Sequence, residues 1–203
     1  MKQYDVVKRG IDVLVGGLAL IISAPVQAAI AVLIRRELGS PVLFRQPRPG
    51  KDGEVFELAK FRTMHAPDPD RGLVTDEQRM TRLGSLLRST SLDELPTLWS
   101  VVKGDMSLVG PRPLLVQYLD RYTPEQARRH EVRPGVTGLA QVSGRNAISW
   151  SEKFAKDVEY VDRRSLRLDV WIAWRTISQV VRRDGISADG EATMHEFIGE
   201  GRG

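Results

Sequence analysis

The sequence predicts an α+β protein that is mostly helical, with an apolar N-terminal segment followed by a small globular domain that carries a short β-hairpin. Three observations predict this class. Residues 13–34 contain no charged side chain. Turn residues at positions 49–53 separate two short strand-like stretches. Most of the remaining chain repeats apolar residues at helical spacing.

The composition is that of a folded chain with a mild excess of positive charge. Of 203 residues, 41% are hydrophobic and 28% are charged, and the net charge is +4. This excess fits anionic lipid headgroups or phosphorylated ligands, whereas dispersed basic residues and an apolar N-terminus disfavour nucleic acid. The sequence contains no cysteine, which excludes disulfides, thiol catalysis and cysteine-ligated metals.

The uncharged stretch Val13–Ile34 is long enough to cross a bilayer, since one helix of this length would extend about 33 Å. A cleaved signal peptide is disfavoured because the apolar run is too long for one. The triplet Ser23-Ala24-Pro25 lies in the middle of the run, where the proline bends or breaks a helix. The sequence therefore predicts either a kinked span or a re-entrant hairpin.

Basic residues flank this stretch on both sides, and such residues favour the cytoplasmic face of a membrane. A spanning helix satisfies that preference at one end only, whereas a hairpin that returns to the same leaflet satisfies it at both. In either arrangement the rest of the chain is expected at the cytoplasmic surface. The flanking residues are Lys2, Lys8 and Arg9 on one side and Arg35 and Arg36 on the other.

The globular region is expected to begin with the hairpin. Its second strand places Lys60 and Arg62 on one face, either as solvated edge charges or as ligand contacts. One helix is expected near Asp76–Arg88, and another is expected to end at Gly104. The Gly- and Ser-punctuated residues 137–150 predict an extended segment.

Two amphipathic helices are expected after that segment. The first begins at Ser149 or Ser151, which are suitable caps. The second carries Trp171 and Trp174 on a face that either packs in the core or lies in a membrane interface. The Gly-rich, polar chain from Asp184 onward predicts a loosely ordered tail.

Asp93 and Glu94 are adjacent carboxylates at the expected start of a helix. Ser91 and Glu94 match the capping box S-x-x-E, so helix capping alone explains the pair. The second interpretation is chemical. A carboxylate can attack phosphorus and form an acyl phosphate while its neighbour handles a cation or a proton. Such chemistry requires the negative charge of the phosphate to be neutralised.

Six basic residues are candidates for that neutralisation, and several lie in turns where backbone amides can also meet phosphate. The motifs G-x-x-x-x-G-K-[ST], G-x-G-x-x-G and G-x-S-x-G are absent, which argues against ordinary NTPases, Rossmann oxidoreductases and α/β-hydrolases. The six candidates are Lys60, Arg62, Arg88, Arg112, Arg133 and Arg145.

The combination of motifs in this chain is more specific than any one of them. The motifs are KFRTM, LGSLLRSTSLDELPTLWSVVKGDMSLVGPRPLL, RHEVRPGVTGLAQVSGRNAISW and KFAKDVEYV. With them, and with its apolar N-terminus, almost the whole chain resembles the bacterial sugar transferase family, the monotopic phosphoglycosyl transferases. It is most similar to the small members that transfer phospho-N,N'-diacetylbacillosamine to undecaprenyl phosphate.

The resemblance implies an arrangement at the membrane. It implies a re-entrant helix-break-helix with Ser23 and Pro25 at the break, interfacial amphipathic helices and a small cytoplasmic catalytic domain. The expected location is the cytoplasmic leaflet of the bacterial inner membrane, as a monotopic protein. The corresponding divisions are 1–38 for the hairpin, 39–185 for the catalytic domain and 186–203 for a flexible polar tail.

The resemblance also implies roles for individual residues. The family's Asp-Glu dyad falls on Asp93, the covalent nucleophile, and on Glu94, which assists with metal or proton handling; both are expected near Mg²⁺. Asp157 and Asp169 match family aspartates whose part is either structural or catalytic. The residues that match substrate-binding elements are Lys60, Arg62, Arg88 and the nucleotide-linked turn Pro111-Arg112-Pro113.

The implied reaction is ping-pong. A UDP-sugar binds with Mg²⁺, Asp93 attacks the phosphorus nearest the sugar, and UMP leaves. Undecaprenyl phosphate then accepts the phosphosugar, which is expected to be an N-acetylated amino sugar 1-phosphate. The alternative is a non-catalytic membrane-surface scaffold that binds anionic lipid. The sequence leaves association into homo-oligomers open.

Overall fold

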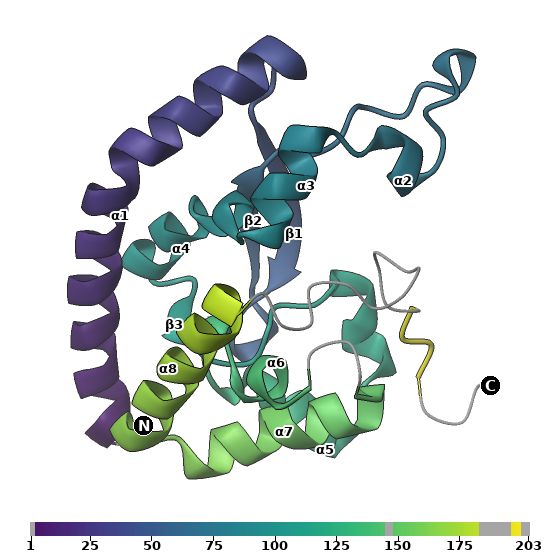
Figure 1. Ribbon diagram of the computed structural model, residues 1–203. Coiled ribbons are helices and arrows are strands. Elements are labelled where there is room, and N and C mark those ends of the chain that lie inside the picture. The colour runs from purple at the N-terminus through teal and green to yellow at the C-terminus, as the bar shows by residue number, and fades with distance from the viewer. Residues whose placement is uncertain (1–2, 145–147, 183–195, 200–203) are drawn as a thin grey trace.

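The structure is a computed structural model that describes residues 3–144, 148–182 and 196–199. In Figure 1 the long helix α1 (Gln3–Glu37) forms one side of the molecule, α7 (Trp150–Arg163) lies across its base, and α8 (Leu166–Arg182) rises from the base toward the middle. A β-hairpin and several short helices lie between them. The expected α+β, mostly helical class is confirmed.

Helix α1 is long and apolar enough to cross a membrane, and it continues through Pro25. Figure 1 shows that it bends partway along its length, with the concave side toward the rest of the protein. Proline removes one helical hydrogen bond, while Ser23 Oγ donates to Ala19 O at 2.7 Å and accepts from Gln27 at 2.9 Å. Because the helix continues from Gln3 to Glu37, the expected break is a bend and not an interruption.

The expected hairpin is present. It consists of β1 (Leu43–Pro49) and β2 (Val55–Phe61), which pair antiparallel with Leu43 opposite Phe61. The turn contains Asp52 at φ 56°, a left-handed conformation that aspartate tolerates better than most residues. The hairpin therefore follows its local turn signal closely.

The chain after β2 projects from the body as an arm (Figure 1). The single helix expected near residues 76–88 is instead two helices, α2 (Asp76–Arg79) and α3 (Arg82–Ser89). They are separate because Thr81 caps the second one, its hydroxyl accepting from the amide of Gly84 at 2.8 Å.

The middle of the chain contains α4 (Thr97–Lys103), α5 (Pro124–Ala127) and a parallel pair of short strands, β3 (Ser107–Val109) and β4 (Gly135–Thr137). Residues 137–150 were expected to be extended, but part of them forms α6 (Leu139–Ser143). Leu139 and Val142 of α6 pack into a buried cluster, so tertiary packing overrides the local Gly and Ser signal.

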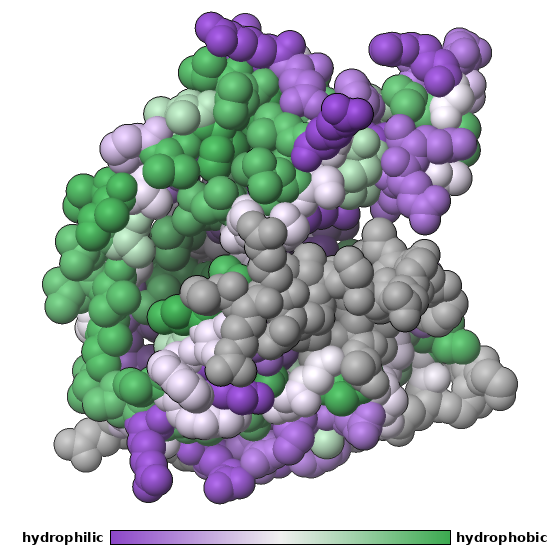
Figure 2. Space-filling view, in the orientation of Figure 1, coloured by the Kyte–Doolittle hydropathy of each residue, from purple (hydrophilic) through white to green (hydrophobic). Residues whose placement is uncertain are grey.

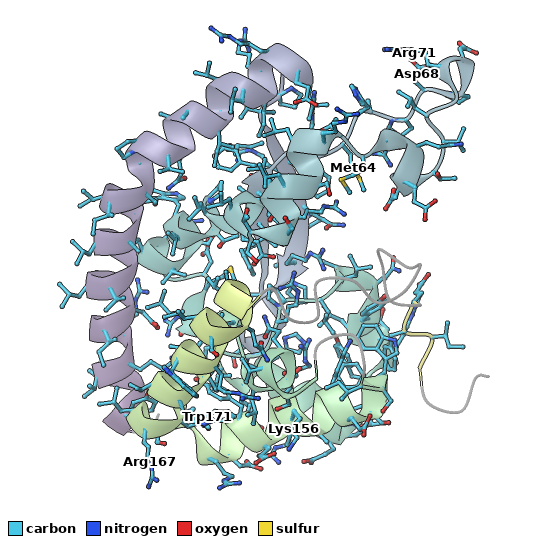
Figure 3. The ribbon with its side chains drawn as sticks, in the orientation of Figure 1. Met64, Asp68, Arg71, Lys156, Arg167 and Trp171 are labelled. Carbon is cyan, nitrogen blue, oxygen red and sulfur yellow. The ribbon has the colours of Figure 1, made fainter. Side chains whose placement is uncertain are left out.

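The two C-terminal helices agree with expectation. Helix α7 begins after Ser149, which forms a capping box with Glu152. On α8, Trp171 is 43% exposed and Trp174 is 61% exposed. The interpretation that these tryptophans pack in the core is therefore wrong. Figure 3 shows Arg167 of the same helix pointing away from the body of the protein.

Helix α1 is attached to the rest of the protein near both of its ends and also along α4, where Arg9 donates to Val101 O at 2.6 Å. Toward its C-terminal end, Ile30 and Ile34 are buried in one cluster with Phe61 and Leu87. Between its ends it exposes large apolar side chains, and Figure 2 shows hydrophobic residues gathered along this helix. Soluble proteins rarely leave so long an apolar surface uncovered.

At its N-terminal end, α1 is held by polar contacts. Asp169 of α8 accepts hydrogen bonds from Tyr4 at 2.7 Å, from Tyr160 at 2.8 Å and from Lys8. Asp12, which is buried, accepts from the amide of Leu108 at 3.0 Å. These contacts connect α1 to α8 and β3, and Tyr160 connects α7 to the same Asp169 carboxylate.

The expected polar tail, 186–203, is described only at residues 196–199. There Phe197 is 4% exposed and packs with Tyr118 and Phe154. Residues 196–199 are therefore packed against the protein, because the large aromatic side chain of Phe197 is buried in the core.

Candidate active site

The two adjacent carboxylates lie in a single 3-10 turn, Leu92–Glu94, between α3 and α4. Ser91 has φ 57°, and its side chain caps no backbone amide. The expected capping box is wrong, because α4 begins only after Pro96 and the Glu94 carboxylate is engaged elsewhere. The turn leaves both carboxylates partly exposed at its surface.

Glu94 holds two basic side chains. Its Oε1 accepts from Lys60 Nζ at 2.5 Å and from Arg112 Nη2 at 2.9 Å. Burial alone would raise the pKa of Glu94, but Arg112 and Lys60 outweigh burial and lower that pKa to about 2. Glu94 is therefore ionised at neutral pH. It holds Lys60 of β2 and Arg112 of the turn after β3 beside the dyad.

Asp93 is held differently. Among the residues that the structure describes, no hydrogen bond or ion pair reaches its carboxylate. Burial raises the pKa of Asp93 and the neighbouring charge of Glu94 raises it further, although Lys60, Arg88 and Arg112 oppose both effects. An ionised carboxylate that is poorly stabilised and has no partner can act as a nucleophile.

Arg88 lies on α3, where its Nε donates to Thr63 Oγ1 at 3.1 Å, and its charge lowers the pKa of Asp93. The helix approaches the end of the hairpin closely at Gly84, since a Cβ there would lie 1.9 Å from Thr63 O. Glycine at this position thus permits the contact that sets the place of Arg88.

The turn Pro111-Arg112-Pro113 follows β3 and presents Arg112 to Glu94. Both prolines are buried, and the backbone oxygen of Arg112 accepts from Arg129 Nη2 at 2.7 Å. Arg129 in turn pairs with buried Asp157 at 2.7 Å. Asp157 therefore lies behind the turn and does not touch the dyad.

Two of the expected basic residues, Arg62 and Arg133, are not brought to the dyad. Arg62 donates to Leu38 O at the end of α1, and it lines an open hollow of about 510 Å³ together with residues 40–45. Arg133 donates from Nε to Gly104 O at 2.7 Å. Arg145 lies outside the described residues. Asp169 also lies apart, in the contacts that hold α1.

Sequence reasoning missed two arginines beside this site, half-buried Arg48 and buried Arg129. Arg48 Nη1 donates to Pro113 O at 3.3 Å, and Arg129 Nη2 donates to Arg112 O at 2.7 Å. No local signal distinguishes them, since Arg129 follows an arginine of the same type, Arg128, that pairs with surface acids.

The donor set fits a Mg²⁺ ion that is shared with a substrate. Among the described residues, no group of three or more acidic, histidine or cysteine side chains is assembled. Mg²⁺ is commonly held by one or two carboxylates, with substrate phosphates and water completing its ligands. Asp93 and Glu94 supply two carboxylates, which matches that pattern.

Comparison with known proteins gives the family of this chain. The family model described as bacterial sugar transferase matches residues 3–183. The chain belongs to the bacterial sugar transferase family. The dyad, Lys60, Arg88 and the turn around Arg112 all lie inside the region matched by this sugar transferase model. The protein is accordingly a transferase enzyme.

Three relatives illustrate the range of this sugar transferase family. The uncharacterized sugar transferase EpsL of Bacillus subtilis is 52% identical over 170 residues, covering 83% of this chain and 84% of the relative. The UDP-glucose:undecaprenyl-phosphate glucose-1-phosphate transferase of Caulobacter vibrioides is 40% identical over 192 residues, covering 89% and 72%. The UDP-N-acetylgalactosamine-undecaprenyl-phosphate N-acetylgalactosaminephosphotransferase of Aeromonas hydrophila is 39% identical over 187 residues, covering 88% and 44%.

Proposed function

We propose that this protein transfers a sugar 1-phosphate from a UDP-sugar to undecaprenyl phosphate and releases UMP, as the first membrane step of glycoconjugate or polysaccharide synthesis. The observation that carries the proposal is the Asp93 carboxylate, which has no hydrogen-bond or ion-pair partner among the described residues and feels the charges of Lys60, Arg88 and Arg112. Two relatives that are named as undecaprenyl-phosphate sugar-phosphate transferases support the same reaction class.

In the first half-reaction, an Asp93 carboxylate oxygen attacks the phosphorus nearest the sugar. The bond from that phosphorus to the bridging oxygen breaks, and UMP leaves with the bridging oxygen. In the second half-reaction, a phosphate oxygen of undecaprenyl phosphate attacks the same phosphorus, and the Asp93 carboxylate leaves. Two displacements of this kind form a ping-pong mechanism through an aspartyl phosphosugar.

The basic side chains reduce the cost of bringing a carboxylate to a diphosphate. Lys60 and Arg112 are fixed by Glu94, so they meet the substrate without reorganising. Bound Mg²⁺, held by Glu94 and Asp93, would neutralise phosphate charge at the same place. The turn around Arg112 is proposed to hold the nucleotide, while Arg62 and Arg133 donate to backbone carbonyls away from the dyad.

The proposed location is the cytoplasmic leaflet of the bacterial inner membrane, with α1 as a re-entrant element. Exposed apolar side chains on α1 and exposed tryptophans on α8 support membrane association. Because the chain has no cysteine, Val7→Cys and Arg36→Cys each introduce a single label site. A re-entrant α1 keeps both sites on the cytoplasmic side, closed to an impermeant maleimide in spheroplasts, whereas a spanning α1 exposes one of them.

The proposed donor is a UDP-linked N-acetylated amino sugar, of which UDP-N,N'-diacetylbacillosamine is one example. The motif that supports this choice, GRNAISW, falls partly outside the described residues. Relatives are named for glucose and for N-acetylgalactosamine, so the donor panel must contain plain hexoses as well as amino sugars.

The test is UMP release from that panel by detergent-solubilised protein with Mg²⁺ and undecaprenyl phosphate. Wild type is compared with Asp93→Asn and with Asp52→Asn, a control at an exposed carboxylate in the hairpin turn. Release that is lost only in Asp93→Asn supports the transferase and identifies its sugar. Release that persists in Asp93→Asn removes Asp93 as nucleophile. Silence across the panel from folded protein favours the lipid-binding scaffold.

A further inference from the structure

The turn Pro111-Arg112-Pro113 is held from behind by two guanidinium groups. Arg129 Nη2 donates to the carbonyl of Arg112 at 2.7 Å, and Arg48 Nη1 donates to the carbonyl of Pro113 at 3.3 Å. A proline has no amide hydrogen, so its turn is fixed mainly through its carbonyls. The position of the Arg112 side chain therefore depends on groups that do not touch the dyad.

Arg129 is almost completely buried, with 2% of its surface exposed. Its Nε and Nη2 donate to one oxygen of Asp157 at 3.0 Å and 2.7 Å, and Nη2 also reaches the carbonyl of Arg112. Burying an ion pair costs solvation, so such a pair is weak grounds for stability alone. The planar guanidinium is suited to hold several acceptors in one fixed geometry.

Two aromatic rings flank the same guanidinium. Arg129 Cζ lies 5.7 Å from the ring centroid of Tyr122 and 5.7 Å from that of Phe154. The hydroxyl of Tyr122 also accepts from Arg129 Nη1 at 3.2 Å. Rings at this distance attract a cation, and they restrict where it can lie.

Phe197 contacts both rings from the C-terminal end of the chain. Its ring centroid is 4.9 Å from Phe154 and 5.9 Å from Tyr122, in edge-to-face and stacked arrangements. Glu196 pairs with Arg121 at 2.7 Å, which fixes the segment from outside. The next side chain, Ile198, is 53% exposed.

We propose that Phe197 is a positioning residue for the nucleotide-binding turn. It supports the rings of Tyr122 and Phe154, these rings and Asp157 hold Arg129, and Arg129 holds the carbonyl of Arg112. The assignment of a nucleotide to this turn rests on the proposed function, but the mechanical connection does not. Residues 196–199 are thereby part of the active-site support.

The test compares Phe197→Ala with Ile198→Ala in the full-length protein by amide hydrogen exchange. In Phe197→Ala, exchange in a peptide covering residues 107–117 should rise about tenfold, as expected when one charge-assisted contact is lost, while exchange in α3 stays unchanged. Ile198→Ala should leave both unchanged. Equal exchange in the two variants, or an equal rise in α3, would overturn the proposal.

Two further measurements keep the test decisive. UMP affinity and the KM for the UDP-sugar should weaken about tenfold in Phe197→Ala, with kcat within about twofold. If Phe197→Ala does not fold, Tyr122→Phe removes only the hydroxyl that Arg129 contacts. It should raise turn exchange about threefold, and no rise would overturn the proposal. A wild type that binds no UMP contradicts the proposed transferase, while the exchange data still decide the positioning.

Discussion

At the scale of single residues, the two carboxylates of the dyad have opposite electrostatic surroundings. Glu94 shares one oxygen between Lys60 and Arg112, whereas Asp93 has a raised pKa and, among the described residues, no partner for its carboxylate. Glu94 thus assembles the positive charges, while the carboxylate of Asp93, the proposed nucleophile, is left without a direct contact among the described residues. The arrangement assigns different work to two adjacent side chains of similar chemistry.

The raised pKa of Asp93 predicts that this residue costs stability. A carboxyl whose folded pKa lies above its unfolded value of 3.8 loses native stability as pH rises through that range. Asp93→Asn should therefore raise the thermal unfolding midpoint at pH 7, while abolishing UMP release. The gain should vanish near pH 3.5, below the unfolded pKa. A lower midpoint at pH 7 would contradict the raised pKa.

Glu94→Gln should move the acidic limb of the pH profile. Burial and the Glu94 charge both raise the pKa of Asp93, and the substitution removes the second cause. The substitution also removes the charge that Lys60 and Arg112 neutralise, so their positive charges, which lower the pKa of Asp93, are no longer offset by Glu94. The acidic limb of kcat/KM should therefore shift to lower pH, on top of a reduced rate. Glu57→Gln, at an exposed pair on β2, is the control and should leave the limb in place.

The limits of sequence reasoning are clearest at two adjacent arginines. Arg128 pairs with Glu125, Glu131 and Asp162 on the surface, while Arg129 is buried against Asp157 behind the active-site turn. The two residues are of the same type and are adjacent in the sequence, so their local sequence context is nearly the same. Only the tertiary structure, which brings α7 against this segment, distinguishes them.

At the scale of elements, a single glycine governs the contact between α3 and the hairpin. Gly84→Ala would place a Cβ 1.9 Å from Thr63 O, so the helix must shift. We expect a loss of about 1–3 kcal/mol in unfolding free energy, as for other overpacked contacts. UMP release should also fall, because Arg88 moves with the helix. Exposed Ser85→Ala on the same helix is the control and should change neither quantity appreciably.

Elements with strong local signals were predictable. The hairpin follows its Pro-Gly and Asp-Gly turn, and α7 begins at the serine cap. Elements determined by long-range packing were not: α6 replaces an extended segment, and the expected capping box at Ser91 is a 3-10 turn. In the site, Lys60, Arg88 and Arg112 were expected beside the dyad, whereas the distant position of Arg62 depends on α1.

At the scale of the whole molecule, α1 and the globular region form one packed unit. The polar contacts at its N-terminal end centre on Asp169, which accepts from Tyr4, Lys8 and Tyr160. Asp169→Asn should lower the unfolding free energy by about 1–3 kcal/mol, because it leaves buried donors poorly paired. Glu57→Gln, at an exposed ion pair, should cost less than about 1 kcal/mol. Chemical unfolding in detergent measures both, and equal losses would show that the Asp169 contacts do not stabilise the attachment.

A helix that is fixed at several points cannot change its curvature independently of the elements that fix it. Helix α1 is fixed near its start through Asp169, along α4 through Arg9, which donates to Val101 O at 2.6 Å, and near its end through Ile34. If the curved helix lies in lipid, lateral pressure or bilayer thickness that straightens it must pull these attachment points apart. The spacing between α8 and the hairpin that supplies Lys60 would then respond to the mechanical state of the bilayer.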